Sequence, residues 1–241
     1  MKSYLRFLSR NKLYTAIEVV GLSVALAFVL IIGSYVWQEY SISRENPDYE
    51  RIYIPTQSMP YGIFEPMKEQ IPEIEKITLV NSFDDVVMEC DDERLVTRGL
   101  AVRGDFFDIF DYEFLIGDAG CLESYTDIVI SESYAAKLAG KPELAVGMKI
   151  VPVDYPSQAY TVTGIIKDFD QNYWKYMDFI CKGESPLNDS AQKNPIFTLS
   201  ATAFIKVAES ADVDSLEGKI QAIFKQLWGE KMKAAMIDQF T

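Results

Sequence analysis

The stretch VVGLSVALAFVLIIGSYVW, residues 19–37, contains no charged side chain over 19 residues. At about 1.5 Å per residue, a helix of this length spans roughly 28 Å, close to the hydrocarbon core of a bilayer at about 30 Å. Tyr14 precedes the run, and Tyr35 and Trp37 lie at its far end, as in the aromatic belts of membrane helices. The run predicts a transmembrane helix over residues 14–38.

Two alternatives explain the same apolar run. A cleaved signal peptide has an apolar region of about 7–15 residues, shorter than this one. Ser41-Ile42-Ser43 is the small-x-small site that follows, and it is a poor cleavage signal. A buried helix of a soluble protein would need a very large core to cover a surface that is apolar on all sides. The membrane helix is therefore the favoured interpretation.

The flanks of the run predict its orientation. Residues 1–13 contain four cations and no acid, so all 36 acidic side chains of the chain follow them. The positive-inside bias places the N-terminus in the cytoplasm and the acidic body outside the inner (cytoplasmic) membrane. Residues 1–13 also predict an amphipathic segment that anchors to anionic membrane lipid. The anchoring cations are Lys2, Arg6, Arg10 and Lys12.

Small residues recur at four-residue spacing within the apolar run, which lets helices approach closely in lipid. The pairs are Gly21 with Ala25 and Ser23 with Ala27. One interpretation is a packing face in a multi-helix bundle. The other is that glycine, serine and alanine are common in any membrane helix.

The rest of the chain alternates short strand and helix patterns, which predicts an α+β body. Strands are expected at 51–55, 74–80, 86–90, 94–98, 128–130, 147–153, 159–167 and 197–207. Helices are expected within 60–71, after Asp105, from 132 to 138 and from 213 to 227. The first strand, helix and strand form a β-α-β unit. The opening unit and the closing strand and helix could share one sheet, with the middle inserted between them.

Four positions predict helix ends. Asp105 and Ser131 are expected N-caps, and Gly140 is placed to end the helix that Ser131 begins. Asp214, with Glu217 three residues later, resembles a capping box.

Composition excludes several kinds of chemistry. The chain has no histidine, which excludes a Ser-His-Asp triad, a Cys-His pair and histidine-ligated metal. Neither a GxxxxGK[ST] loop nor a G-x-S-x-G elbow occurs. An acidic chain with a pI near 4.5 argues against nucleic acid as a partner. No residue is nominated as a nucleophile, general base or cofactor ligand, so no enzyme is expected.

Three groups of residues have both a structural and a functional interpretation. The chain has three cysteines, Cys90, Cys121 and Cys181. They are interpreted either as one oxidised pair with one thiol left over or as three small buried side chains. A run of acids could attract Ca²⁺ but lacks the EF-hand order, so a solvated hairpin tip is favoured. Its members are Asp84, Asp85, Glu89, Asp91, Asp92 and Glu93. The aromatic group Phe106, Phe107, Phe110, Tyr112 and Phe114 is expected in the core.

Nearly all of residues 8–230 resembles one family. RNKLYTAIEVVGLSVALAFVLIIGSYVWQE followed by RENPDYERIY is similar to the start of FtsX-like/MacB-type ABC transporter permeases. The likeness continues through PEIEKITLV, GDFFDIFDYEFLIGD, IVISESYAAKLAGK, VGMKI and YTVTGIIKDF, which resemble the MacB-like periplasmic core domain. The order and spacing of these segments carry the resemblance.

The resemblance implies an architecture and a role. A first transmembrane helix leads to an extracytoplasmic domain with a Porter-like part, here 48–88 with 196–230, and an inserted Sabre-like part, 89–195. The resemblance also implies that this subunit performs no catalysis. It implies that the subunit couples ATP hydrolysis by a separate cytoplasmic P-loop ATPase subunit to motion of the outer domain, called mechanotransmission, for export or for hydrolase activation. Implied partners are a second permease copy in a dimer and a periplasmic adaptor, lipoprotein or cell-wall hydrolase.

The sequence departs from the family pattern at two places. Glu18 stands where relatives commonly carry an uncharged polar residue. The sequence also stops at Thr241, where the family re-enters the membrane, which predicts either the first part of a longer permease or a lone anchored domain. The alternative function is therefore a stand-alone, single-pass binding or sensing module. A membrane-anchored enzyme is the third hypothesis.

Overall fold

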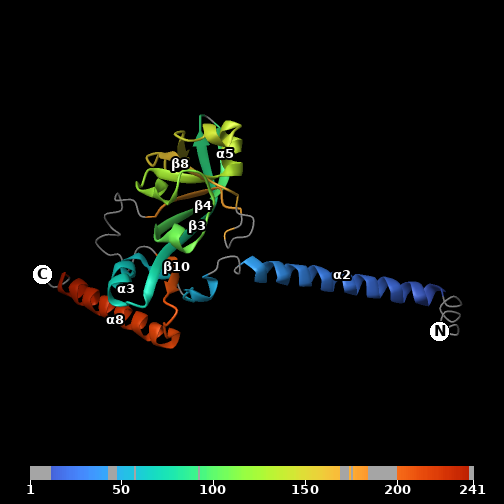
Figure 1. Ribbon diagram of the computed structural model, residues 1–241, viewed down its shortest axis with the longest axis horizontal. Helices are drawn as coiled ribbons and strands as arrows, with labels where there is room; N and C mark the ends of the chain where they lie inside the picture. Colours follow the sequence, from blue (N-terminus) through green and yellow to red (C-terminus); the bar gives the residue numbers. More distant parts are fainter. Residues whose placement is uncertain are drawn as a thin grey trace. The chain divides into compact units, whose positions relative to one another are not determined.

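The computed structural model describes residues 12–42, 48–56, 58–91, 93–168, 174, 176–183 and 200–238 (Figure 1). The chain divides into two compact units, residues 1–45 and 46–241.

The first unit contains helix α2 (Lys12–Ile42), which includes the predicted span of 14–38. Its part Lys12–Trp37 is long and apolar enough to cross a membrane, with a mean hydropathy of 2.5, and it is the one such helix in the described ranges. Its large apolar side chains are exposed on every side. The hydroxyl of Ser23 donates to the carbonyl of Val19 at 2.7 Å, so this polar group is satisfied within the helix. The apolar surface of this helix is suited to contact with the lipid tails of a membrane.

The second unit is a mixed α/β domain. Its helices are η1 (Tyr49–Arg51), η2 (Tyr61–Ile63), α3 (Phe64–Gln70), α4 (Phe106–Ile109), η3 (Ala119–Leu122), α5 (Glu132–Ala139), η4 (Pro142–Leu144) and α8 (Val213–Asp238). Its strands are β1 (Ile52–Tyr53), β2 (Met59–Pro60), β3 (Ile74–Cys90), β4 (Glu93–Gly104), β5 (Phe114–Ile116), β6 (Asp127–Ser131), β7 (Lys149–Pro152), β8 (Tyr160–Ile166), β9 (Phe179–Lys182) and β10 (Ser200–Val207).

The strands form one sheet in the order β1-β10-β3-β4-β9-β6-β8-β5. Strand β7 pairs with β3 on one side and with β8 on the other, so β3, β4, β9, β6, β8 and β7 close a ring of six strands. This ring is a small barrel, and β10 and β1 extend the sheet from it. Helices α3 and α8 lie at the β10 end of the domain, and α5 lies at the other end (Figure 1).

Three cores hold the domain together. The first lies where α3 and α8 pack on β3 and β10, and it includes Met67, Leu79 and Leu216. The second fills the barrel, into which α5 inserts Tyr134. The third covers the outside of β4, β6 and β9 with aromatic rings. Because successive strand residues point to opposite faces, Leu100 joins the third core while Ala101 joins the second.

Strand β3 joins the whole domain. The sequence predicts two strands at 74–80 and 86–90, whereas the structure has one strand of 17 residues. A bulge between Phe83 and Val86, with Asp85 at φ 57°, bends the strand without ending it. As a result β3 contributes side chains to all three cores. The predicted hairpin is confirmed, since Cys90 pairs with Glu93.

The opening β-α-β unit is split. Strand β10 lies between β1 and β3 and is antiparallel to both, which pairs Ile52 with Lys206 and Lys206 with Lys76. The last described strand of the chain is therefore inserted into the first supersecondary unit. The expectation that the opening unit and the closing strand share one sheet is confirmed.

Several local predictions are confirmed and others are corrected. Ser131 accepts a hydrogen bond from the Tyr134 amide at 3.2 Å and begins α5, which ends before Gly140 at φ 75°. Strand β9 has four residues and is not among the strands predicted from the sequence. Helix α8 begins at Val213, so Asp214 lies in its first turn instead of preceding it.

Candidate functional site

An ion cluster lies where the chain joins the domain after α2. We call it the β1–β10 ion cluster, and it consists of Asp48, Arg51, Glu75 and Lys206. Strand β1 lies beside β10, which places the turn before β1 against the end of β10 that leads to α8. The chain's path into the domain and its path toward α8 therefore lie on neighbouring strands.

Arg51 is the centre of this cluster. Its Nη2 lies 2.5 Å from Asp48 Oδ1, and its Nη1 lies 3.0 Å from Glu75 Oε2. The same Nη1 donates to the carbonyl of Val207 at 3.2 Å. Lys206 Nζ also pairs with Asp48, and its side chain is only 14% exposed. One guanidinium thus ties the segment before β1 to both β3 and β10.

The partners in this cluster stabilise the charged form of each side chain. Hydrogen bonds from Lys206 and Arg51 lower the pKa of Asp48. The hydrogen bond to Asp48 raises the pKa of Arg51. Nearby, Lys219 on α8 pairs with Glu73 just before β3 and lowers the pKa of that carboxyl. Helix α8 is therefore bound to the start of the same strand.

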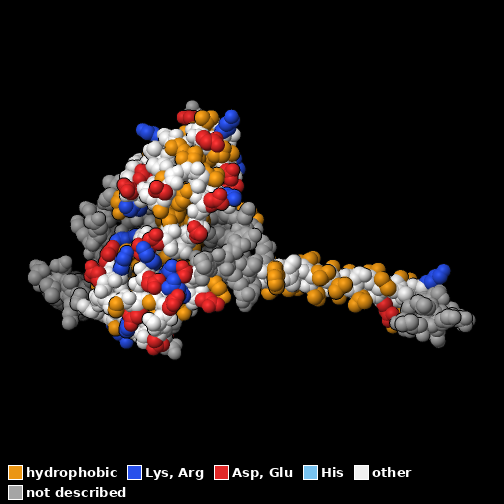
Figure 2. All heavy atoms as spheres, viewed as in Figure 1, with side chains coloured by type: hydrophobic (Ala, Val, Ile, Leu, Met, Phe, Trp, Pro, Cys, Tyr) orange, Lys and Arg blue, Asp and Glu red, His pale blue; other side chains and the backbone are white. Residues whose placement is uncertain are grey.

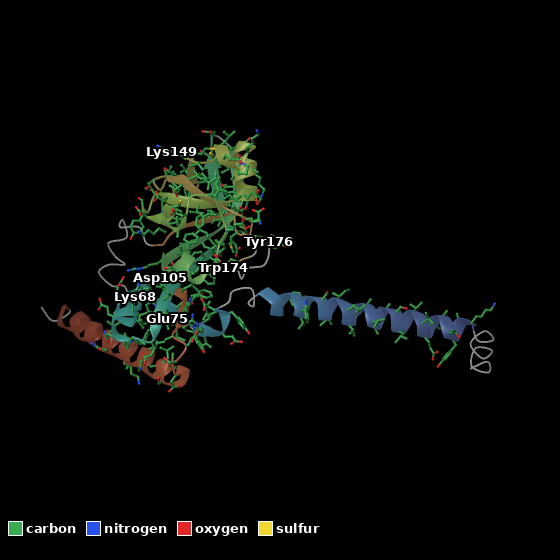
Figure 3. All side chains as sticks on the ribbon, viewed as in Figure 1. Lys68, Glu75, Asp105, Lys149, Trp174 and Tyr176 are labelled. Atoms are coloured by element: carbon green, nitrogen blue, oxygen red, sulfur yellow. The ribbon has the colours of Figure 1, made fainter. Side chains whose placement is uncertain are left out.

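A second charged cluster surrounds the end of β4. The Asp105 carboxylate lies 3.1 Å from Lys68 Nζ of α3 and accepts the Ile77 amide of β3 at 3.2 Å (Figure 3). It makes no side-chain cap of α4, which corrects the prediction for Asp105. Gly104 is required here, since its φ is 86° and a Cβ would lie 2.5 Å from the Ile77 carbonyl.

Figure 2 shows this surface with Lys and Arg interspersed among Asp and Glu. Lys76 pairs with Asp108 at 2.8 Å, and Arg103 pairs with Glu65 at 3.5 Å while lying over the Phe64 ring. Charges of both signs therefore alternate over this face, and neighbouring side chains partly neutralise one another.

A polar pocket lies at one mouth of the barrel, where β6 and β8 end and β9 begins. We call it the barrel-mouth pocket; its volume is about 470 Å³. Its lining residues are Asp85, Val96, Thr97, Arg98, Ser133, Lys137, Asp168, Tyr176, Met177 and Asp178. Trp174 packs into the third core just before it, whereas Tyr176 is exposed (Figure 3).

Hydrogen bonds to the backbone fix the acidic wall of this pocket. Asp178 Oδ2 accepts the Arg98 amide at 2.9 Å, and the Asp178 amide donates to the Arg98 carbonyl at 2.7 Å. Asp168 Oδ1 accepts the Ser133 amide at 2.9 Å at the first turn of α5. These carboxylates are therefore positioned by the strands and helix that close the barrel.

The structure places the sequence-predicted residues as follows. Gly21, Ser23, Ala25 and Ala27 lie on α2, where a Cβ at Gly21 would meet nothing within 4 Å. Lys12 begins α2, while Lys2, Arg6 and Arg10 lie outside the described residues. Neither the β1–β10 ion cluster nor the barrel-mouth pocket was found from sequence. The Asp48-x-x-Arg51 spacing is the one local signal for the ion cluster, because Glu75 and Lys206 are distant in the chain.

The remaining candidates have structural roles. Cys90 and Cys181 are buried and Cys121 is half-buried, all as free thiols. Burial raises the pKa of Cys181 to about 12 and also raises that of Cys90. In the acidic run, Asp84 pairs with Arg98 and Glu89 with Arg94, and no group of three metal-ligating side chains forms within the described ranges. Phe106 and Phe110 are core residues, as predicted, and the Trp174 ring meets Phe106 in a tilted arrangement and Phe110 edge-to-face.

Known structures share this fold. A domain assigned to a permease protein from Porphyromonas gingivalis matches with a TM-score of 0.64 and 20% identity, over 75% of this chain and 82% of that chain. The periplasmic region of MacB from Actinobacillus actinomycetemcomitans matches with a TM-score of 0.51 and 12% identity, over 75% and 83% of the two chains. The extracellular domain of the noncanonic ABC-type transporter YknZ from Gram-positive bacteria matches at 0.51 and 12%, over 73% and 87%.

No curated protein matches the sequence. The family described as the MacB-like periplasmic core domain matches residues 15–223. This match begins inside α2 and ends inside α8, so it includes the apolar run 19–37, every strand of the described residues and the β1–β10 ion cluster. The chain therefore belongs to the family of the MacB-like periplasmic core domain of ABC transporter permeases.

Proposed function

We propose that this chain is the N-terminal part of an FtsX/MacB-type permease that couples ATP hydrolysis by a partner subunit to motion of its outer domain. The observation that carries the proposal is the continuous family match from the apolar helix to α8. The helix and the domain are thereby parts of one family unit. The proposed outcome of the motion is export or the activation of a hydrolase.

The β1–β10 ion cluster supports this coupling role. The chain reaches the domain through Asp48 and Arg51, directly after the segment that follows α2. In this proposal a displacement of α2 enters the domain at Asp48 and Arg51, and Arg51 is bound to Glu75 on β3 and to Val207 at the end of β10. Because β3 continues to the barrel, the displacement passes into the far end of the domain without crossing a loop.

We propose that the domain has a Porter-like part, 48–88 with 196–230, and a Sabre-like part, 89–195. The first core draws its residues from 59–79 and 201–223 and supports the Porter-like assignment. The second core draws from 88–181 and supports the Sabre-like assignment. The proposed boundary falls inside β3, so a single strand joins the two parts.

The proposal includes an orientation and partners. The N-terminus is cytoplasmic, with Lys2, Arg6, Arg10 and Lys12 on membrane lipid. A P-loop ATPase binds on that side, and a second permease copy completes a dimer. The Gly21/Ala25 and Ser23/Ala27 face packs against other membrane helices. A periplasmic adaptor, lipoprotein or cell-wall hydrolase contacts the outer domain.

The experiment places the complete permease and its ATPase in nanodiscs with fluorophores on α5 and on α8. ATP should change the energy transfer between the fluorophores, while a hydrolysis-deficient ATPase should not. Asp48→Asn should reduce the change at an unaltered ATPase rate, because Arg51 and Lys206 lose their shared partner. Glu50→Gln is the matched control, since Glu50 lies outside the ion cluster. An identical signal with and without ATP would contradict the proposal.

A topology experiment tests the orientation separately. Protease added to intact spheroplasts should digest the domain of residues 46–241 and spare the N-terminal segment. A domain that stays intact in spheroplasts but is digested after lysis would show the opposite orientation. Reading the natural gene past Thr241 separates the permease from a stand-alone module, since further apolar runs are expected there.

A further inference from the structure

The barrel-mouth pocket has the position of a ligand site. Ligand sites occur preferentially in the mouths of β-barrels, and volumes of about 300–1,000 Å³ are typical. This pocket lies at the mouth that α5 crosses, and its volume of about 470 Å³ falls in that range. Tyr134 of α5 fills the barrel beneath it, so a ligand would remain at the rim instead of entering the barrel.

Two cations, Arg98 and Lys137, line this pocket, and they make few ion pairs among the described residues. Arg98 has one ion pair among the described residues, a long 3.5 Å contact from its Nε to Asp84. That leaves its two Nη groups, which form the fork that suits a carboxylate. Lys137 lies one helical turn beyond Ser133 on the exposed side of α5 and has no ion-pair partner in the described part of the chain.

Three carboxylates face the same space. Asp178 and Asp168 each use one oxygen on a backbone amide, which holds the carboxylate in place and leaves its other oxygen for a ligand. Asp85 sits at the β3 bulge with φ 57°, which turns this residue out of the regular ladder. The pocket therefore has two carboxylates fixed by backbone hydrogen bonds, with Asp178 beside Arg98 and Asp168 on the first turn of the helix that carries Lys137.

An apolar wall completes the pocket. Val96 is 67% exposed although it lies within β4, and Tyr176 is 66% exposed. Tyr176 has φ 71°, a conformation that costs a non-glycine residue about 1–3 kcal/mol. Met177 lies between Tyr176 and the fixed Asp178. An aliphatic side chain of a ligand could pack on this wall.

We propose that the barrel-mouth pocket binds a short peptide with both ends free. The ligand's carboxylate pairs with Arg98 and Lys137, and its ammonium group pairs with the carboxylates of Asp85, Asp168 and Asp178. The three carboxylates would repel a simple anion, and Arg98 and Lys137 would repel a simple cation. A zwitterion is the ligand class whose two charges match both sets.

The test is isothermal titration of the full chain in detergent micelles with the tripeptide Ala-Leu-Ala. Binding should weaken about tenfold when the peptide is amidated at its C-terminus and by a similar factor when it is acetylated at its N-terminus. Raising the salt concentration should weaken binding of the free peptide, since its charged ends carry the recognition. No heat at millimolar peptide, or equal affinity for the doubly capped peptide, would overturn the proposal.

Substitutions in the pocket test whether the peptide binds there. Lys137→Gln and Arg98→Gln should each weaken the free tripeptide about tenfold but leave the C-amidated peptide unchanged, because only the former has the carboxylate they bind. Lys141→Gln is the matched control on an exposed lysine outside the pocket. Thermal unfolding checks that each variant folds. If both substitutions leave the affinity for the free tripeptide unchanged, the peptide does not bind in this pocket.

Discussion

Gly104 and Gly147 provide a matched test of how closely α3 packs on the end of β4. Both glycines have positive φ, 86° and 85°, so alanine pays the same conformational cost at either position. Their surroundings differ. A Cβ at Gly147 would meet nothing within 4 Å, whereas a Cβ at Gly104 would lie 2.5 Å from the Ile77 carbonyl and 2.6 Å from the Phe64 ring.

The expected magnitudes follow from this difference. Gly147→Ala should lower the free energy of unfolding by about 1–2 kcal/mol, the cost of a left-handed conformation for an L-residue. Gly104→Ala should cost the same amount plus about 1–3 kcal/mol of overpacking, because the Ile77 carbonyl belongs to the β3 backbone and cannot rotate away. The expected loss at Gly104 is therefore about 2–5 kcal/mol in all.

The measurement is urea unfolding of residues 46–241, followed by tryptophan fluorescence. This fragment contains every residue of the three cores, and Trp174 reports on the third of them. Linear extrapolation gives the free energy of unfolding for each variant. Equal losses for the two alanine variants would refute the close approach of Phe64 and Ile77 to Gly104, and with it the docking of α3 at this corner.

Three further outcomes are expected of the same fragment. The stability that Asp48 contributes is present above about pH 4 and is lost as pH falls through its lowered folded-state pKa. Asp48→Asn should therefore make the urea midpoint of unfolding fall less steeply as the pH is lowered into the acid range. An unchanged slope of the urea midpoint against pH would contradict this. Maleimide should label Cys121 well before Cys90 and Cys181, because those two thiols are buried; faster labelling of Cys181 would argue against the barrel core. Ser131→Ala should cost about 0.5–2 kcal/mol through loss of the α5 N-cap, and Ser131→Asp should restore most of it.

The sequence predicted those elements that depend only on residues close together in the chain. The β6 strand, the cap at Ser131 and the stop at Gly140 follow one another within a few residues, and all three are confirmed. The aromatic group around Phe106 was expected in the core because of its helical spacing. Its rings do pack in the third core. The apolar run 19–37 predicted its helix for the same reason, since length and composition are properties of one segment.

Non-local contacts decided what the sequence did not predict. Strand β9 has four residues and gains its place by pairing with β4 and β6, where the Phe179 ring covers Gly99. The Asp105 side chain bonds Ile77 and Lys68 in preference to its own helix, because both lie across the fold within its reach. The two candidate sites were missed for the same reason, since each combines residues from distant segments.

The sequence by itself determined the membrane-length helix, the acidic α+β body behind it and the kind of family to which they belong. Only the tertiary structure decided that β7 bridges β3 and β8 to close a barrel, that β10 separates β1 from β3, and that Arg51 meets Glu75 and Val207. The physical reason is that periodicity and caps act over a few residues, whereas strand order and ion pairing depend on which distant segments the cores bring into contact.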